Sequence, residues 1–253
     1  MIVTFLGTGT SLGVPVVGCA CATCTSPDPR NRRTRTSVLL SLGERRILID
    51  TSPDLRAQAL ARGVMRVDAV LYTHAHADHM LGLDDLRIYG FRQGEQIPLY
   101  GSAQTIAALK RTFWYAFDPA PTVSTRPQVR LLEVKDRFEV LGQTVEMIPV
   151  LHEQVVIHGF RVGAFAYVTD ASRIPDESRA RLQGLDVLVL NALRRRPHPS
   201  HFTLEQAVAE AKKLGARRTY LTHLSDELEH TATEAALPES VRLAYDGLTL
   251  EIN

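Results

Sequence analysis

The segment from residue 74 to residue 79, His-Ala-His-Ala-Asp-His, concentrates side chains that bind metal ions. Three imidazoles and one carboxylate within six residues suit a packed core poorly, because each buried polar group needs a hydrogen-bond partner or a metal. In an extended loop, alternation would place His74, His76 and Asp78 on one side and His79 on the other. The spacing predicts two neighbouring metal sites and outweighs the alternative of ordinary surface histidines.

Further polar residues stand where strand-like segments end. These residues end or directly follow apolar, β-type runs. They are Asp50, the 74–79 motif, His152, Asp170 and His223. Ligands at the ends of strands are held by a rigid scaffold, which suits a metal site. For Asp50 two roles remain open, as the cap partner of the following helix or as a carboxylate that orients a ligand histidine.

The composition limits the possible partners. The chain has 253 residues and a net charge of +1, with 29 Lys and Arg against 28 Asp and Glu. We expect a single domain over residues 1–253. The balanced charge disfavours a global field that attracts nucleic acid or an anionic membrane. The N-terminus lacks a secretory pattern and no run has membrane-spanning length, so we expect a cytoplasmic protein without a membrane partner.

The three cysteines of the chain, Cys19, Cys21 and Cys24, lie within six residues. An odd number so closely spaced in a cytosolic protein indicates metal binding rather than disulfides. Three thiolates suit one tetrahedral zinc ion, whose fourth ligand must come from elsewhere in the chain. The alternative, three small buried hydrophobic side chains, is the weaker interpretation.

Three short segments have more than one interpretation. The glycine-rich loop at residues 7–13 is either a tight turn or a close approach to a phosphate. The arginines between residues 30 and 35 are expected on a solvated surface, with an anion contact as the weaker alternative. The run Arg194–Arg196 is expected either on such a surface or against a phosphate.

The remaining pattern predicts an α/β protein. Strands are expected at residues 2–6, 37–41, 46–50, 68–72, 129–134, 138–141, 144–151, 160–169, 186–190, 218–222 and near the C-terminus. Helices are expected at residues 52–62, 82–91, 102–117 and 204–214. Thr203 and Gln206 form a predicted capping box for the last of these, with Gly215 just beyond its end.

This succession of ligands resembles the metallo-β-lactamase superfamily along nearly the whole chain. The resemblance implies a four-layer αββα sandwich. It further implies that one metal ion is held by His74, His76 and His152, the second by Asp78, His79 and His223, and that Asp170 bridges them.

Four details narrow the resemblance. The segment 8–11, the cysteine motif, the segment 50–54 and His201 before a capped helix are similar to the phosphoribosyl cyclic phosphodiesterases of the carbon-phosphorus lyase pathway and their relatives. The family carries a structural zinc whose fourth ligand lies three residues after the last active-site histidine. That position is Asp226 here, with His230 as the alternative. The resemblance also suggests a homodimer.

The ligand set indicates phosphodiester hydrolysis. Two metal ions roughly 3.5 to 4 Å apart can share a hydroxide, aim it at phosphorus and neutralise the phosphoryl oxygens. His201 is predicted to protonate the leaving oxygen, with His198 as its rival. Asp78 is counted with His201 among the catalytic residues. Mixed imidazole and carboxylate ligands suit manganese or zinc. We expect a small, cyclic phosphodiester substrate, such as a cyclic ribose phosphate or a 2′,3′-cyclic nucleotide.

Three other functions compete with phosphodiester hydrolysis of a small molecule. An RNA-processing nuclease like tRNase Z would insert a substrate arm between His152 and Asp170, and the 18 residues between them leave no room for it. Together with the balanced charge, this makes nucleic acid an unexpected substrate. Thioester or lactam hydrolysis does not explain His201 or the basic runs. A catalytically silent metal-binding module would be suggested by a missing ligand, and none is missing.

Overall fold

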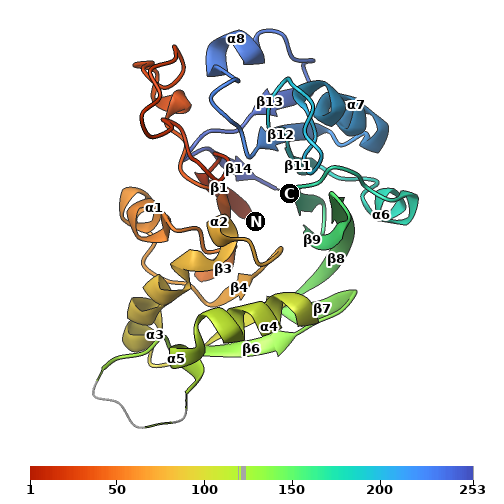
Figure 1. Ribbon diagram of the computed structural model, residues 1–253. Helices are drawn as coiled ribbons and strands as arrows, with labels where there is room; N and C mark the ends of the chain where they lie inside the picture. Colours follow the sequence, from red (N-terminus) through yellow and green to blue (C-terminus); the bar gives the residue numbers. More distant parts are fainter. Residues whose placement is uncertain (119, 121–123, 253) are drawn as a thin grey trace.

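The computed structural model describes residues 1–118, 120 and 124–252. Two seven-stranded β-sheets form its centre (Figure 1). The first sheet has the order β14 (Thr249–Glu251), β1 (Ile2–Gly7), β2 (Ser37–Leu42), β3 (Arg45–Ile49), β4 (Ala69–Leu71), β5 (Ile97–Gly101) and β6 (Val129–Glu133). The second has the order β13 (Val241–Leu243), β12 (Arg218–Thr222), β11 (Val187–Asn191), β10 (Phe165–Val168), β9 (Val155–Val162), β8 (Gln143–His152) and β7 (Arg137–Val140).

The two sheets pack face to face because alternate strand residues are apolar. Phe5 and Ile47 of the first sheet share one buried cluster with Phe160 and Tyr167 of the second. Their sequence neighbours point outward, where Leu48 joins the cluster under the helices of the first sheet. Period-two alternation with both faces buried is the pattern of a sheet covered on each side.

Helices cover both outer faces, which completes the four-layer αββα arrangement expected from the resemblance (Figure 1). Residues of α1 (Leu55–Arg62), the 3-10 helix η2 (Leu81–Leu86), α3 (Arg87–Gln93) and α4 (Ala103–Thr112) pack on the first sheet. Residues of α7 (Leu204–Leu214) pack on the second. The shorter helices are α2 (Ala77–Met80), α5 (Trp114–Phe117), α6 (Asp176–Arg181), α8 (His230–Glu234) and the 3-10 helix η1 (Pro29–Asn31).

Parallel pairing brings the functional residues to one edge. Strands β3 and β4 are parallel neighbours in the first sheet, and β10, β11 and β12 are parallel neighbours in the second. Asp50 follows β3, the 74–79 motif follows β4, Asp170 follows β10 and His223 follows β12. The carboxyl ends of parallel strands meet at the same edge, where open α/β folds bind their ligands.

The predicted helices and strands have mixed outcomes. Thr203 and Gln206 form the predicted capping box of α7, and Gly215 ends it at φ 63°. The expected helix at residues 52–62 begins only at Leu55, because Asp54 occupies its N-cap position. The single strand predicted for residues 160–169 is wrong: a turn at Gly163, with φ 58°, separates β9 from β10. In the described ranges, none of the helices has the length and apolar character needed to cross a membrane.

The structure places residues of all three ambiguous segments. A Cβ on Gly7 would lie 2.1 Å from the carbonyl oxygen of Arg35, so the glycine permits close packing of two backbone segments. The prediction that the arginines between residues 30 and 35 lie on a solvated surface is wrong for Arg33, which is 1% exposed. In the run 194–196, Arg195 pairs with Glu205 at 3.3 Å and Arg196 pairs with Glu227.

Candidate metal centre

The 74–79 motif leaves β4 as an extended segment and then turns into a helix. His76 is the N-cap residue of α2, with ψ 153°, and Asp78 and His79 lie in the first turn of that helix. The expectation that Asp78 shares a side with His74 and His76 is therefore wrong, because a period of two ends at His76. The helical turn instead directs Asp78 and His79 toward a common set of partners.

Ligand atoms of Asp78, His79, Asp170 and His223 all lie within 4.8 Å of one another. His79 Nε2 is 3.4 Å from Asp78 Oδ2 and 3.4 Å from Asp170 Oδ2. His223 Nε2 is 3.5 Å and 3.3 Å from the same two oxygens. Two imidazoles and two carboxylates that face each other at these distances fit one divalent ion.

A second group of imidazoles adjoins the first. The ring centroid of His74 lies 4.6 Å from that of His76 and 5.7 Å from that of His152. His152 Nδ1 donates a hydrogen bond of 2.7 Å to the main-chain oxygen of Asp170, which leaves Nε2 free to bind a metal. His74 Nε2 is 3.9 Å from Asp170 Oδ2. Asp170 therefore contacts both groups.

Several buried ring nitrogens of the centre have no hydrogen-bond partner among the described residues. They are Nε2 of His74, Nε2 of His79, Nδ1 of His201 and both ring nitrogens of His223. Buried polar atoms are nearly always hydrogen-bonded, so a cluster of exceptions requires an explanation. Metal ions at the nitrogens of His74, His79 and His223 would supply it, and the residues present therefore fit a dinuclear metal centre.

The pKa values of the buried groups also indicate that the centre suits a cation. Burial acts against ionisation of Asp170, yet the charges of His223 and His79 hold the pKa of its carboxyl well below the ordinary value. Burial likewise acts against a charged His79, yet Asp170, Asp78 and Asp50 hold the pKa of that imidazole well above its ordinary value. The carboxylates thus attract positive charge, which a divalent cation supplies.

Asp50 orients two of the ligand histidines, His79 directly and His74 through Thr73. It is fully buried, and its Oδ2 accepts a hydrogen bond of 2.8 Å from Nδ1 of His79. Thr73 donates to the same carboxylate through its backbone nitrogen and its hydroxyl, both at 2.8 Å, and its hydroxyl lies 3.0 Å from Nδ1 of His74. Of the two roles considered for Asp50, the structure shows the orienting one. Sequence reasoning missed Thr73, whose only signal was its position between β4 and the motif.

His201 lies beside the centre. Its ring centroid is 4.8 Å from that of His152 and 4.8 Å from that of His223, and its Nδ1 is 4.0 Å from Asp170 Oδ2. Backbone bonds of the next residue, Phe202, to Ala171 and Leu193 fix its position. Burial, followed by the charge of His223, lowers the pKa of His201 to about 3. The rival His198 is farther out, with its ring 5.1 Å from that of His201 and its Nδ1 bonded to Ser200.

A cavity of about 600 Å³ opens at this edge. Its lining includes His201 and His198 together with the side chains of Glu153, Gln154, Ser172, Arg173 and Gln206. The backbone of Arg173 is fixed by two hydrogen bonds to Leu151, next to His152. Arg173 lines the cavity, and among the described residues its guanidinium group has no ion-pair partner.

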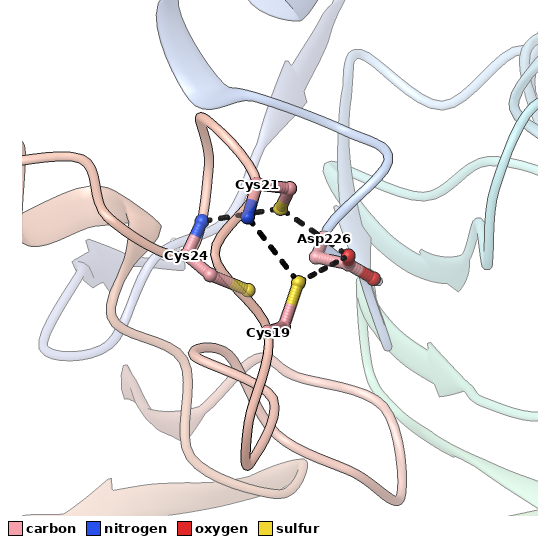
Figure 2. Close-up of side chains that lie close together, drawn as sticks. All are labelled: Cys19, Cys21, Cys24 and Asp226. Atoms are coloured by element: carbon pink, nitrogen blue, oxygen red, sulfur yellow. Dashed lines mark hydrogen bonds between the residues drawn. The ribbon is translucent and has the colours of Figure 1, made fainter.

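The three cysteines meet one carboxylate (Figure 2). Asp226 Oδ2 lies 3.7 Å from the sulfur of Cys19 and 3.4 Å from that of Cys21. The four ligand atoms of Cys19, Cys21, Cys24 and Asp226 all lie within 4.8 Å of one another, as one tetrahedral ion requires. His230 is directed elsewhere, with its Nε2 3.1 Å from Glu234. We call these four residues the thiolate site.

Comparison with known proteins establishes the class. Residues 45–224 match the family model described as the β-lactamase superfamily domain. A crystal structure described as a new diphosphatase from the PhnP family is 45% identical and superimposes with a TM-score of 0.94, covering 100% of this chain and 98% of that one. Fold and site together thus define a metal-dependent hydrolase with the metallo-β-lactamase fold. The chain belongs to the β-lactamase superfamily, which confirms the resemblance seen in its motifs.

Two further relatives carry different activities in their names. An octanoyltransferase from Porphyromonas gingivalis (strain ATCC BAA-308 / W83) is 40% identical over 248 residues, covering 96% of this chain and 50% of the relative. The chain therefore spans about half the length of that protein. A ribonuclease Z from Mycobacterium sp. (strain KMS) is 27% identical over 255 residues, covering 86% of this chain and 90% of the relative.

Proposed function

We propose that the protein is a phosphodiesterase that hydrolyses a small, cyclic phosphodiester at a dinuclear metal centre. One observation carries the proposal. A single oxygen, Oδ2 of Asp170, lies 3.9, 3.4 and 3.3 Å from ring nitrogens of His74, His79 and His223. A carboxylate oxygen between two groups of imidazoles occupies the position that a bridging ligand needs.

The ligands divide into two sets around this oxygen. His74, His76 and His152 would hold one ion, and Asp78, His79 and His223 the other, with Asp170 common to both. When bound, the two ions would activate water and neutralise the phosphoryl oxygens during in-line displacement. The mixed imidazole and carboxylate donors suit zinc or manganese. Cys19, Cys21, Cys24 and Asp226 would hold a third, structural zinc ion.

His201 would donate the proton that the leaving oxygen needs. Its lowered pKa leaves the ring neutral at pH 7 in the free protein. A phosphate group bound beside the ring brings negative charge within a few ångströms, which raises the pKa of an imidazole and favours its protonated form. We infer that binding of the phosphate is the step that would favour the acid form of His201.

The cavity at His201 supports a small substrate. Its volume of about 600 Å³ falls in the range of sites for small molecules. Between His152 and Asp170 the chain forms only the strands β9 and β10 and their turns, so the position of a nuclease arm is taken by a hairpin. Cyclic ribose phosphates and 2′,3′-cyclic nucleotides fit these constraints better than a folded RNA.

Acyl transfer is not favoured by the site. The octanoyltransferase is about twice the length of the matched segment, so its name does not assign that activity to the half shared with this chain. Two facing groups of imidazoles and carboxylates suit a metal-assisted hydrolysis. On the strength of the resemblance, we also propose that the protein is a homodimer and cytoplasmic. Light scattering after size exclusion would measure twice the monomer mass if the dimer forms.

The test is hydrolysis of bis(p-nitrophenyl) phosphate by metal-depleted protein after manganese or zinc is restored. We expect turnover that depends on the metal and is lost in Asp170→Ala. The loss should exceed the roughly 100-fold typical of removing an outer ligand partner. Absence of turnover with both metals, despite stoichiometric binding, would contradict the phosphodiesterase. Comparison of cyclic phosphates with structured RNA then separates the small-molecule enzyme from a nuclease.

A further inference from the structure

Arg33 is the largest fully buried side chain of the described residues, with 1% of its surface exposed. Its guanidinium group has no carboxylate within ion-pair distance in the described parts of the chain. Burial lowers the pKa of Arg33 to about 10, so the group keeps its charge at neutral pH. A buried charge is costly unless its environment compensates it, so the partners of Arg33 are informative.

All of those partners are neutral oxygens, and two of them are carbonyls on a single segment after β12. Nη1 of Arg33 donates a hydrogen bond of 2.8 Å to the carbonyl of Ser225, and Nη2 donates one of 2.6 Å to the carbonyl of Leu228. Nη2 also lies 3.2 Å from Oδ1 of Asn31, which accepts from the backbone nitrogen of His230 at 2.9 Å. The planar guanidinium thus binds two carbonyls at once and fixes the segment 225–228.

This segment lies close to one ligand of each proposed metal site. His223 of the metal centre lies two residues before it, in the left-handed region at φ 58°. Asp226 of the thiolate site lies within it. Only two residues separate His223 from Asp226. Asp226 thus lies between the two carbonyls that Arg33 binds, and the first of them, at Ser225, is two residues from His223.

Arg33 is also tied to the loop that carries the cysteines. Its backbone nitrogen and oxygen form a pair of hydrogen bonds with Val14, at 2.7 and 2.8 Å. Two residues later, the backbone nitrogen of Val16 donates to the sulfur of Cys24 at 3.3 Å. Figure 2 shows the cysteine loop, in faded red, facing the pale blue segment of Asp226. Arg33 therefore joins the two halves of the thiolate site.

We propose that Arg33 is a positioning residue that couples the thiolate site to the metal centre, so that loading of one site strengthens metal binding at the other. The coupling runs through the segment 223–228. This inference rests on the two metal sites proposed above and is independent of the reaction. Coupling between sites is reciprocal, and values of roughly 5- to 150-fold in affinity are typical.

The test is a double-mutant cycle followed by titration with Co²⁺, without substrate. Thiolate-bound cobalt shows sulfur-to-metal charge transfer, so the two sites are read separately in one spectrum. In the wild type we expect Cys24→Ser, which disables the thiolate site, to weaken cobalt binding at the metal centre by about tenfold. Arg33→Met should weaken it similarly, and the double variant should be no weaker than Arg33→Met alone.

The matched control is Arg32→Met, which removes an exposed arginine one position away and should leave both sites unchanged. Circular dichroism establishes that each variant is folded. If Arg33→Met does not fold, Arg33→Lys replaces it, since an ammonium keeps the charge but lacks the rigid fork that binds two carbonyls. Additive effects in the cycle, or independent filling of the two sites in the wild type, would overturn the coupling. Failure of the protein to hydrolyse any phosphodiester would not affect this measurement.

Discussion

The metal centre and the thiolate site use opposite means to gather their ligands. The centre takes residues from β8, α2 and the ends of β4, β10 and β12, so each side chain is fixed by a different part of two packed sheets. The thiolate site takes three of its four ligands from one loop of six residues. We infer that the fold imposes the geometry of the centre before any ion binds, whereas the geometry of the thiolate site depends on its ion.

Backbone conformation shows the same contrast. Asp50, Asp170 and His223 have φ values of 62°, 59° and 58°, in the left-handed region that non-glycine residues seldom occupy. Packed strands and directed hydrogen bonds hold them there. Near the thiolates the positive φ values belong to Gly13 and Gly18, which adopt them freely. Non-glycine residues thus adopt this strained conformation at the centre, whereas glycines adopt it in the cysteine loop.

The largest effect concerns His201, which lies beside the centre and is proposed to act as an acid rather than as a ligand. His201→Ala should lower kcat by roughly 10²- to 10⁴-fold for a phosphodiester with a poor leaving group, because protonation of the leaving oxygen is lost. With a p-nitrophenolate leaving group, which needs no proton, the loss should be small. Equal losses for both substrates would indicate that His201 binds metal instead.

The next effect tests whether the carboxylate of Asp50 fixes the orientation of His79. Asp50→Asn keeps the shape of the side chain but removes the charge that orients His79. We expect metal affinity at the centre to fall by about 10- to 100-fold, as for other outer partners of ligand histidines. Circular dichroism of the variant serves as the control for folding. An unchanged affinity at the centre would show that packing alone orients His79.

A pH titration should separate the two sites further. Burial raises the pKa of Cys24 to about 11, so its thiol is protonated at neutral pH until zinc displaces the proton. Zinc binding therefore releases protons, and affinity should fall as pH falls, by about tenfold per unit for each proton displaced. Chelator competition between pH 6 and 9 measures this slope. A flat profile would mean that the thiolates are already ionised without metal.

The smallest effect concerns Asp226. Asp226→Ala should release zinc from the thiolate site and lower the melting temperature by roughly 2–4 °C for each kcal/mol of lost stability. At saturating metal, turnover should remain unchanged, because no residue of the thiolate site lines the cavity beside His201. Asp226→His provides the matched control, since imidazole is an equally suitable zinc ligand. A large loss of turnover at saturating metal would contradict the purely structural role.

The sequence was most informative for the residues proposed as ligands of the metal centre. The 74–79 motif and the single residues His152, Asp170 and His223 could be predicted to converge, because each follows a strand and strands end at sheet edges. Their roles as ligands remain predictions. The helical turn at Asp78 could not be foreseen, because a four-residue helix has too few positions to show a periodicity.

Other features depend on contacts between distant segments. An arginine run looks the same whether it is solvated or buried, and only the carbonyls of Ser225 and Leu228 explain Arg33. Spacing alone could not choose between Asp226 and His230, since both lie near the end of the same strand. The hairpin within residues 160–169 was hidden because Gly163 is the only turn signal in an apolar run.

The distribution of ligands along the chain also sets an order in time. Cys19, Cys21 and Cys24 leave the ribosome together, so a nascent chain can capture zinc through them early in synthesis. The metal centre needs His223, which follows the next-to-last strand of the second sheet, and long-range contacts of this kind form late in folding. We therefore expect the active-site ions to enter an almost finished protein, which makes their identity depend on the metals available after folding.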